Sequence, residues 1–173
     1  MERHSTESKN ILVPVFVAMT LLFLALPAEA QIQWQTHGGA QVRFSHPQTW
    51  QARPNGNIMT IAAPGGGVAV DIAGITNGAQ AVQAEAQVLQ VLGTRFRNVQ
   101  VRGRRPVAQH GMSGQQIFGA CVGANGQPVE WMAFYLRHPN NRTGVIAIGF
   151  ALPGYRQAHW PALSQILNSI QPA

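Results

Sequence analysis

Short stretches of alternating apolar and polar residues recur along most of the chain after its first thirty positions. The clearest is at 68–72, where Val68, Val70 and Ile72 alternate with a small and an acidic residue. A period of two residues is typical of a strand with one face on a core. Further strands are expected at 42–44, 50–53, 58–62, 99–105, 116–122, 129–137 and 145–150.

Two Asn-Gly pairs separate neighbouring strands of this set, at Asn55–Gly56 and Asn125–Gly126. Both residues of such a tight turn take positive φ, which asparagine and glycine accept most readily. The flanking strands are therefore expected to form antiparallel hairpins. Pro106 is expected to close the strand that starts near Val99.

Two segments have the spacing of three and four residues that indicates an amphipathic helix. The first covers about 79–96, with Thr76 and Asn77 as candidate caps. Its expected apolar face is Val82, Ala86, Leu89, Leu92 and Phe96, and its expected solvated face is Gln80, Gln83, Gln87 and Gln90. The second covers about 157–170, with Trp160, Leu163, Leu167 and Ile170 on one face.

These elements predict an α+β fold. Hairpin turns favour one antiparallel sheet of about six to seven strands, and the two amphipathic helices would cover it as an α/β/α sandwich. No repeat and no long linker divides the chain, so residues 31–173 are expected to form a single domain.

The first thirty residues have a different pattern. A polar start with Arg3 and Lys9 precedes an apolar run over 11–27, and Ala28 and Ala30 then supply two small residues. These are the three parts of a secretory signal peptide. The alternative is a membrane anchor, but spanning needs about 20 apolar residues. We therefore expect cleavage after residue 30, export to the periplasm or medium of a bacterium, and no transmembrane segment afterwards.

Two short motifs at the ends of the predicted domain suggest a fold family. Phe44-Ser45-His46-Pro47 followed by Trp50 resembles the opening of PsbP-like and DcrB-like domains, and Ile166-Leu167-Asn168-Ser169-Ile170 is similar to their close. The resemblance spans about residues 40–171. It implies an antiparallel sheet sandwiched by helices, and an accessory or binding role rather than catalysis. It carries over no catalytic residues.

Charge adds a functional hint, because residues 31–173 contain ten arginines, no lysine and three acids. Such an excess favours anionic surroundings such as lipid headgroups, acidic polysaccharide or nucleic acid. Compositional bias of a GC-rich genome explains it equally well. The candidate anion-binding residues are Arg95, Arg97, Arg102, Arg104 and Arg105.

Within this group, Arg102 and Arg104 are expected to project from the same face of their strand. Guanidinium groups bind phosphate and carboxylate in a bidentate manner. Export argues against nucleic acid as the partner, and the patch lacks the interleaved aromatic residues that stack on bases. An anionic envelope surface or an acidic protein fits better.

Catalytic and metal-binding patterns are weak. Cys121 lies in an apolar strand, where a small buried residue is the simpler interpretation than a nucleophile. Asp71 and Glu130 are the best carboxylate pair for hydrolysis, although each has many arginines available as partners. The histidines are dispersed, which does not favour metal. His110 with His138 remains a pair that folding could bring together.

The sequence thus predicts an exported, non-enzymatic accessory or binding module that acts on a protein or an anionic envelope component, without a cofactor or metal. The alternative is a small exported hydrolase that uses Cys121 or the pair Asp71 and Glu130.

Overall fold

The computed structural model describes residues 31–76, 81–139 and 142–173. Their main feature is a seven-stranded sheet with the strand order β3-β4-β5-β9-β8-β7-β6, in which all neighbouring strands are antiparallel. The strands are β3 (Gln51–Asn55), β4 (Ile58–Ala62), β5 (Val68–Thr76), β6 (Arg97–Gln109), β7 (Met112–Val122), β8 (Pro128–Arg137) and β9 (Thr143–Ala151).

A second sheet joins the two ends of the domain. It has the order β1-β2-β10, with β1 (Ile32–His37), β2 (Val42–Pro47) and β10 (Gln171–Pro172), and a 3-10 turn (Gly38–Ala40) connects the first two strands. The sequence patterns did not predict β1 or β10. β10 has only two residues, too few to show a period of two.

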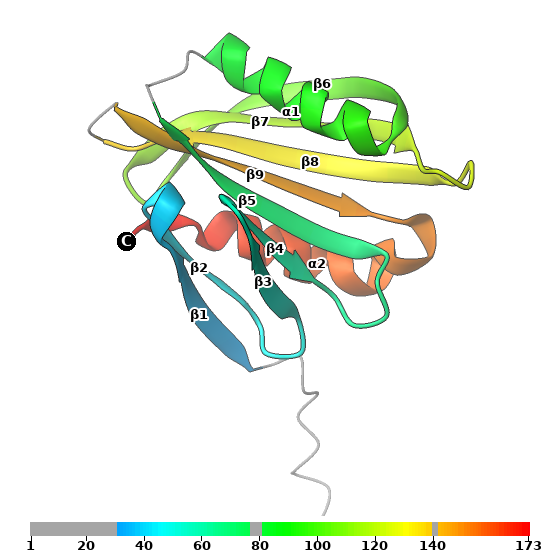
Figure 1. Ribbon diagram of the computed structural model, residues 1–173, viewed down its shortest axis with the longest axis horizontal. Coiled ribbons are helices and arrows are strands. Elements are labelled where there is room, and N and C mark those ends of the chain that lie inside the picture. The colour runs from blue at the N-terminus through cyan, green and yellow to red at the C-terminus, as the bar shows by residue number, and fades with distance from the viewer. Residues whose placement is uncertain (1–30, 77–80, 140–141) are drawn as a thin grey trace, which may run out of the picture.

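The two helices lie on opposite faces of the large sheet (Figure 1), α1 (Ala81–Arg95) on one and α2 (Pro153–Ser169) on the other. Each helix has its own core. Leu163, Ile166 and Leu167 of α2 pack into one core, which β2 also enters, while Ala84, Val88 and Leu92 of α1 pack into the other. The predicted α/β/α layering is confirmed, and the small sheet is an addition to it.

The helix boundaries and faces differ in part from the prediction. α2 begins at Pro153, where proline suits the first helical turn because its missing N–H would have no partner there. Ala86 is exposed rather than buried, and Ala84 and Val88 take its expected role beside Leu92. The expected solvated glutamines Gln83, Gln87 and Gln90 are all exposed. The structure does not describe residues 77–80, which include the candidate cap Asn77 and the expected helix start with Gln80. It also leaves the side chains of Thr76 and Val82 undescribed.

The predicted end of β6 at Pro106 is wrong. The strand continues to Gln109, and Pro106 is paired with Gln115 of β7. β6 forms one edge of the sheet, where a proline can place its donor-free nitrogen on the open side. Both predicted hairpins are confirmed, since β3 with β4 and β7 with β8 are antiparallel neighbours. The expectation of positive φ at both turn residues is wrong: Gly56 and Gly126 have it but Asn55 and Asn125 do not, and Asn55 is the last residue of β3, paired with Ile58.

Candidate binding groove

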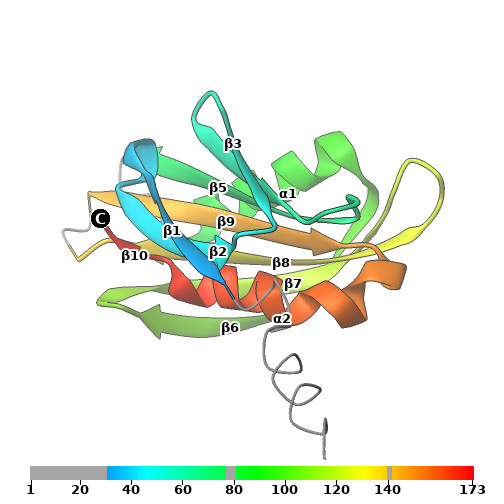
Figure 2. The same ribbon diagram turned by 90° about the horizontal axis from the view of Figure 1, so that it is seen from below.

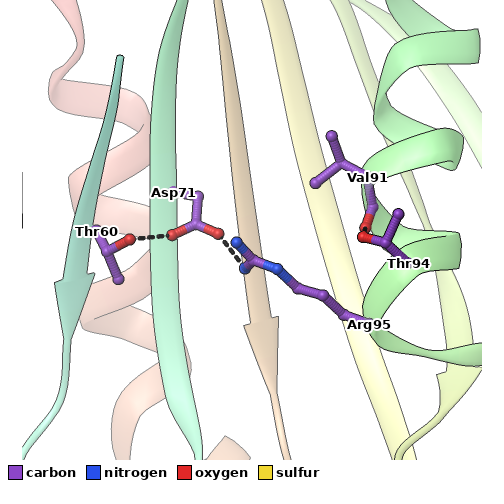
Figure 3. A network of polar contacts seen from close by, with 5 residues as sticks. All are labelled: Thr60, Asp71, Val91, Thr94 and Arg95. Carbon is purple, nitrogen blue, oxygen red and sulfur yellow. Dashed lines mark hydrogen bonds and ion pairs between the residues drawn. The ribbon is translucent and has the colours of Figure 1, made fainter. Parts of the chain in front are cut away.

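Four of the five candidate arginines make hydrogen bonds within the domain, and the first three are Arg95, Arg97 and Arg104. Arg95, at the end of α1, reaches Asp71 of β5, which also accepts a hydrogen bond from the Thr60 hydroxyl at 2.6 Å (Figure 3). Arg97 donates to the backbone oxygen of Ala124 at 2.9 Å. Arg104 pairs with Glu85 of α1 through two hydrogen bonds of 2.5 and 2.8 Å, and these bonds lower the pKa of Glu85.

The remaining two candidates, Arg102 and Arg105, lie on the other side of the sheet. Between Val101 and Gly103 the register of β6 against β7 shifts by one residue, which marks a β-bulge. Val101 accordingly packs with the α1 core, whereas Val107 packs with the α2 core. The expectation that Arg102 and Arg104 share a strand face is therefore wrong, because the bulge changes the alternation between them.

Arg102 and Arg105 form one wall of a groove of about 410 Å³ between the sheet and α2. Figure 2, viewed from the α2 side, shows α2 and the edge strand β6 that bound it. The opposite wall is a stripe of α2 with one residue every fourth position: Arg156, Trp160, Ser164 and Asn168.

The floor of the groove is largely apolar. Phe118 of β7 is exposed, and Met132 and Phe134 of the neighbouring strand β8 are buried. Gln116 is also buried and accepts a hydrogen bond from the Arg105 guanidinium. The groove thus combines aromatic and aliphatic contact area with polar walls, which is typical of ligand pockets that fix the orientation of a bound group.

The charges of the groove are only partly neutralised. Glu130 pairs with Arg156 at 2.8 Å, and the Arg156 guanidinium also lies 5.3 Å from the centroid of the Trp160 ring. Arg105 has the neutral Gln116 as its partner, and Arg102 has no hydrogen-bond or ion-pair partner among the described residues. Two positive charges therefore remain available to an anionic group.

A second cavity, of about 350 Å³, lies between α1 and strands β4, β5 and β9. Its lining is mainly aliphatic, with Ile58, Ile75 and Ile148 among its residues. Asp71 is the acidic residue in this lining, but both of its carboxylate oxygens already have partners (Figure 3). Asp71 is thus already satisfied, and the cavity gives no indication of which ligand would fill it.

The geometry does not support hydrolysis at the residues that the sequence offered. Asp71 points to the α1 side of the sheet and Glu130 to the groove on the α2 side, so they cannot flank one bond. Cys121 is buried, and desolvation raises the pKa of its thiol to about 11, so the nucleophilic thiolate does not form near neutral pH.

His110 and His138 each contact a different backbone oxygen. The Nε2 atom of His110 lies 3.1 Å from the backbone oxygen of Asn168, and that of His138 lies 3.0 Å from the backbone oxygen of Ala40. Across 31–76, 81–139 and 142–173, no three potential metal ligands form a group. In the same part of the chain, no helix has the length and apolar character needed to cross a bilayer.

Sequence reasoning found two of the groove's cationic residues and missed Arg156, Trp160 and Phe118. Trp160 had been assigned to the apolar face of its helix, where it is half-buried. One signal was available: Arg156 and Trp160 are four residues apart, the spacing that places side chains together on a helix. Phe118 gave no signal, because its exposure depends on how far α2 extends over the sheet.

No family model matches the chain, and no curated protein matches it. Solved structures do. The solution structure of cyanobacterial PsbP from Synechocystis sp. PCC 6803 has a TM-score of 0.60 at 6% identity, covering 83% of this chain and 94% of that one. LpqN of Mycobacterium tuberculosis, involved in cell envelope biogenesis, has a TM-score of 0.53 at 16% identity, covering 82% and 91%. The Ran-binding protein Mog1p of Saccharomyces cerevisiae has a TM-score of 0.53 at 9% identity, covering 82% and 95%. At these identities the likeness concerns the fold, and this chain has the PsbP-like fold that its opening and closing motifs predicted.

Proposed function

We propose that the chain is an exported, non-enzymatic binding module, and that its domain, residues 31–173, holds an anionic partner in the groove between β6 and α2. The partner is a protein or an anionic component of the bacterial envelope. The proposal includes removal of residues 1–30 as a signal peptide on export to the periplasm or medium.

One observation carries the proposal: Arg102 and Arg105 lie on the wall of a concave surface with an apolar floor, and no acid in the described part of the chain pairs with them. A solvated arginine on a convex surface has no such neighbours. A group that enters the groove can form charge-assisted hydrogen bonds and bury apolar surface at the same time. Both terms favour binding of a charged ligand with some apolar character.

The structural neighbours give additional support for a binding role. Mog1p is described as a Ran-binding protein and LpqN as involved in cell envelope biogenesis. Neither description names a reaction. A shared fold with such proteins is compatible with a module that acts by recognition, and the groove supplies a surface for it.

The test measures how strongly the protein, purified after any cleavage by its host, is retained on three anionic supports. The supports are vesicles containing phosphatidylglycerol, an acidic polysaccharide and polyglutamate. We expect retention on at least one support, and a decrease as salt rises because ionic contacts are screened. Arg102→Gln combined with Arg105→Gln should weaken it about tenfold, the loss expected when two charge-assisted contacts disappear.

The matched control is Arg53→Gln combined with Arg137→Gln, which removes the same charge from exposed positions outside the groove. Retention should change little in this control. Equal losses in the two double variants would show that only net charge matters. Absence of retention on all three supports would also contradict the proposal.

A further inference from the structure

The shape of the groove limits the kind of ligand that fits it. Its α2 wall consists of four residues spaced four apart, from Arg156 to Asn168. At the helical rise per residue, this stripe is about 18 Å long. An extended polypeptide advances about 3.3 Å per residue, so a segment of five or six residues matches this length.

The chemistry of the two walls also suits a peptide. Arg102 and Arg105 supply cationic donors on the β6 side, while Ser164 and Asn168 supply a hydroxyl and an amide on the α2 side. The hydroxyl and amide can each donate to and accept from a peptide backbone. A peptide in the groove therefore finds partners for its main chain as well as for acidic side chains.

The floor would accept apolar side chains of the same segment. Phe118, Met132 and Trp160 face the groove, and aromatic residues, methionine and arginine are enriched in protein interfaces. In an extended chain successive side chains point to opposite sides. Acidic residues at alternate positions can therefore face the arginine wall while the residues between them contact the floor.

We infer that the groove binds an extended, acidic segment of a partner protein, about six residues long, with acidic and apolar side chains in alternation. This inference rests on the proposed function and specifies its partner. The binding energy comes from Arg102 and Arg105, which have no acidic partner among the described residues, and from burial of Phe118, a residue that is 39% exposed in the free protein.

A lipid fits the groove less well. An acyl chain requires apolar surroundings on all sides, because a buried polar group without a partner is costly, and here both walls carry charged or polar side chains. The headgroup region of a bilayer is broad and flat, whereas Arg102 and Arg105 line a concavity. An arginine cluster that docks on a membrane would lie on a protruding surface instead.

The inference can be tested with a displayed library of random hexapeptides that is selected on the full, processed chain. We expect enrichment of peptides with aspartate or glutamate at alternate positions and apolar residues between them. The enrichment should be lost on the Arg102→Gln/Arg105→Gln variant and kept on the Arg53→Gln/Arg137→Gln variant. An enriched peptide should bind about tenfold more weakly to the first variant.

Both arginine pairs are exposed, so we expect both variants to remain folded. Unfolding curves of the two variants check this and separate a loss of binding from a folding defect. No enrichment, enrichment of peptides without acids, or equal enrichment on all three proteins would overturn the inference. If phosphatidylglycerol vesicles or polysaccharide nevertheless required Arg102 and Arg105, the proposed function would stand with a different partner. If neither peptides nor these supports bound, both proposals would fail.

Discussion

Each acidic side chain after residue 30 has an arginine as its partner, and these pairs decide which arginines remain for other contacts. The pairs are Asp71 with Arg95, Glu85 with Arg104, and Glu130 with Arg156. In the first pair the two partners differ in exposure, since the Asp71 side chain is 6% exposed whereas that of Arg95 is 40% exposed. This asymmetry makes the two partners of the pair energetically unequal.

We predict that Arg95→Gln destabilises the domain more than Asp71→Asn. Loss of the guanidinium leaves a buried carboxylate without its counter-ion, at a cost of about 2–4 kcal/mol. In Asp71→Asn the side-chain amide can still contact Thr60 and the exposed Arg95 can be hydrated, so we expect about 1–2 kcal/mol. Urea denaturation measures both values, and Asp71→Asn in the Arg95→Gln background should cost less than alone. The opposite ranking would contradict this account of the pair.

Cys121 gives a prediction about pH. Burial raises the pKa of its thiol from 9.0 to about 11 in the folded state. Between these values the unfolded chain releases the thiol proton and the folded chain keeps it, so the free energy of unfolding falls as pH rises. Below the unfolded pKa both states hold the proton and this thiol contributes no pH dependence.

Urea denaturation at about pH 8 and about pH 10.5 should therefore show a loss of stability that Cys121→Ala reduces. Burial raises the pKa of Tyr135 as well, so part of the loss should remain in the variant. Iodoacetamide should modify the native thiol slowly and the urea-unfolded thiol quickly. Rapid modification of the native protein at neutral pH would contradict the buried position and revive Cys121 as a candidate nucleophile.

At the scale of elements, the sequence predicted what depends on local pattern. The Asn-Gly turns, the alternation of Val68, Val70 and Ile72, and the spacing of Leu163 and Leu167 each specify a strand, a turn or a helix face without reference to the rest of the chain. The fold class follows from their order. The PsbP-like motifs pointed to the same architecture.

The features that were missed depend on pairing between distant segments. β10 has two residues and exists because β2 is beside it. The bulge in β6 adds one residue relative to β7, and no local pattern shows such an insertion. Because one extra residue turns every later side chain to the other face, this single feature separated Arg102 from Arg104 and placed Arg102 and Arg105 on the same groove wall.

Strands β6 and β7 approach each other closely at Gly119, and Gly93 of α1 provides a comparison without such a contact. A Cβ added at Gly119 of β7 would collide with the backbone oxygen of Gln100 in β6, whereas one added at Gly93 of α1 would meet no atom within 4 Å. We predict that Gly119→Ala destabilises the domain by about 2–4 kcal/mol and that Gly93→Ala stabilises it by about 0.5 kcal/mol.

Thermal or urea unfolding of the two variants provides the measurement, with Gly93→Ala as the control for loss of a glycine. Because Gly119 also lines the groove beside Phe118, Gly119→Ala should weaken retention on anionic supports even under conditions where it remains folded. A Gly119→Ala protein as stable as the original would contradict the close approach of the two strands.

At the scale of the whole molecule, the chain has two faces with different properties. On the α1 side, Arg95 and Arg104 are paired with acids, and the cavity beneath the helix is mainly aliphatic. On the α2 side, Arg102 and Arg105 remain available to an anion in a groove. The sheet therefore determines which of these four arginines have an acidic partner and which face the groove.

We predict that residues 1–30 are cleaved on export, which would remove two of the twelve basic and three of the six acidic residues. The first strand begins at Ile32, one residue after the expected new terminus at Gln31. Signal peptidase requires small side chains at Ala28 and Ala30. In a bacterial host, the periplasmic or secreted protein should have a mass that corresponds to residues 31–173, and Ala28→Leu combined with Ala30→Leu should accumulate the uncleaved chain at the membrane. An intact N-terminus on the wild-type protein in the cytoplasm would contradict export, and with it an envelope partner for the groove.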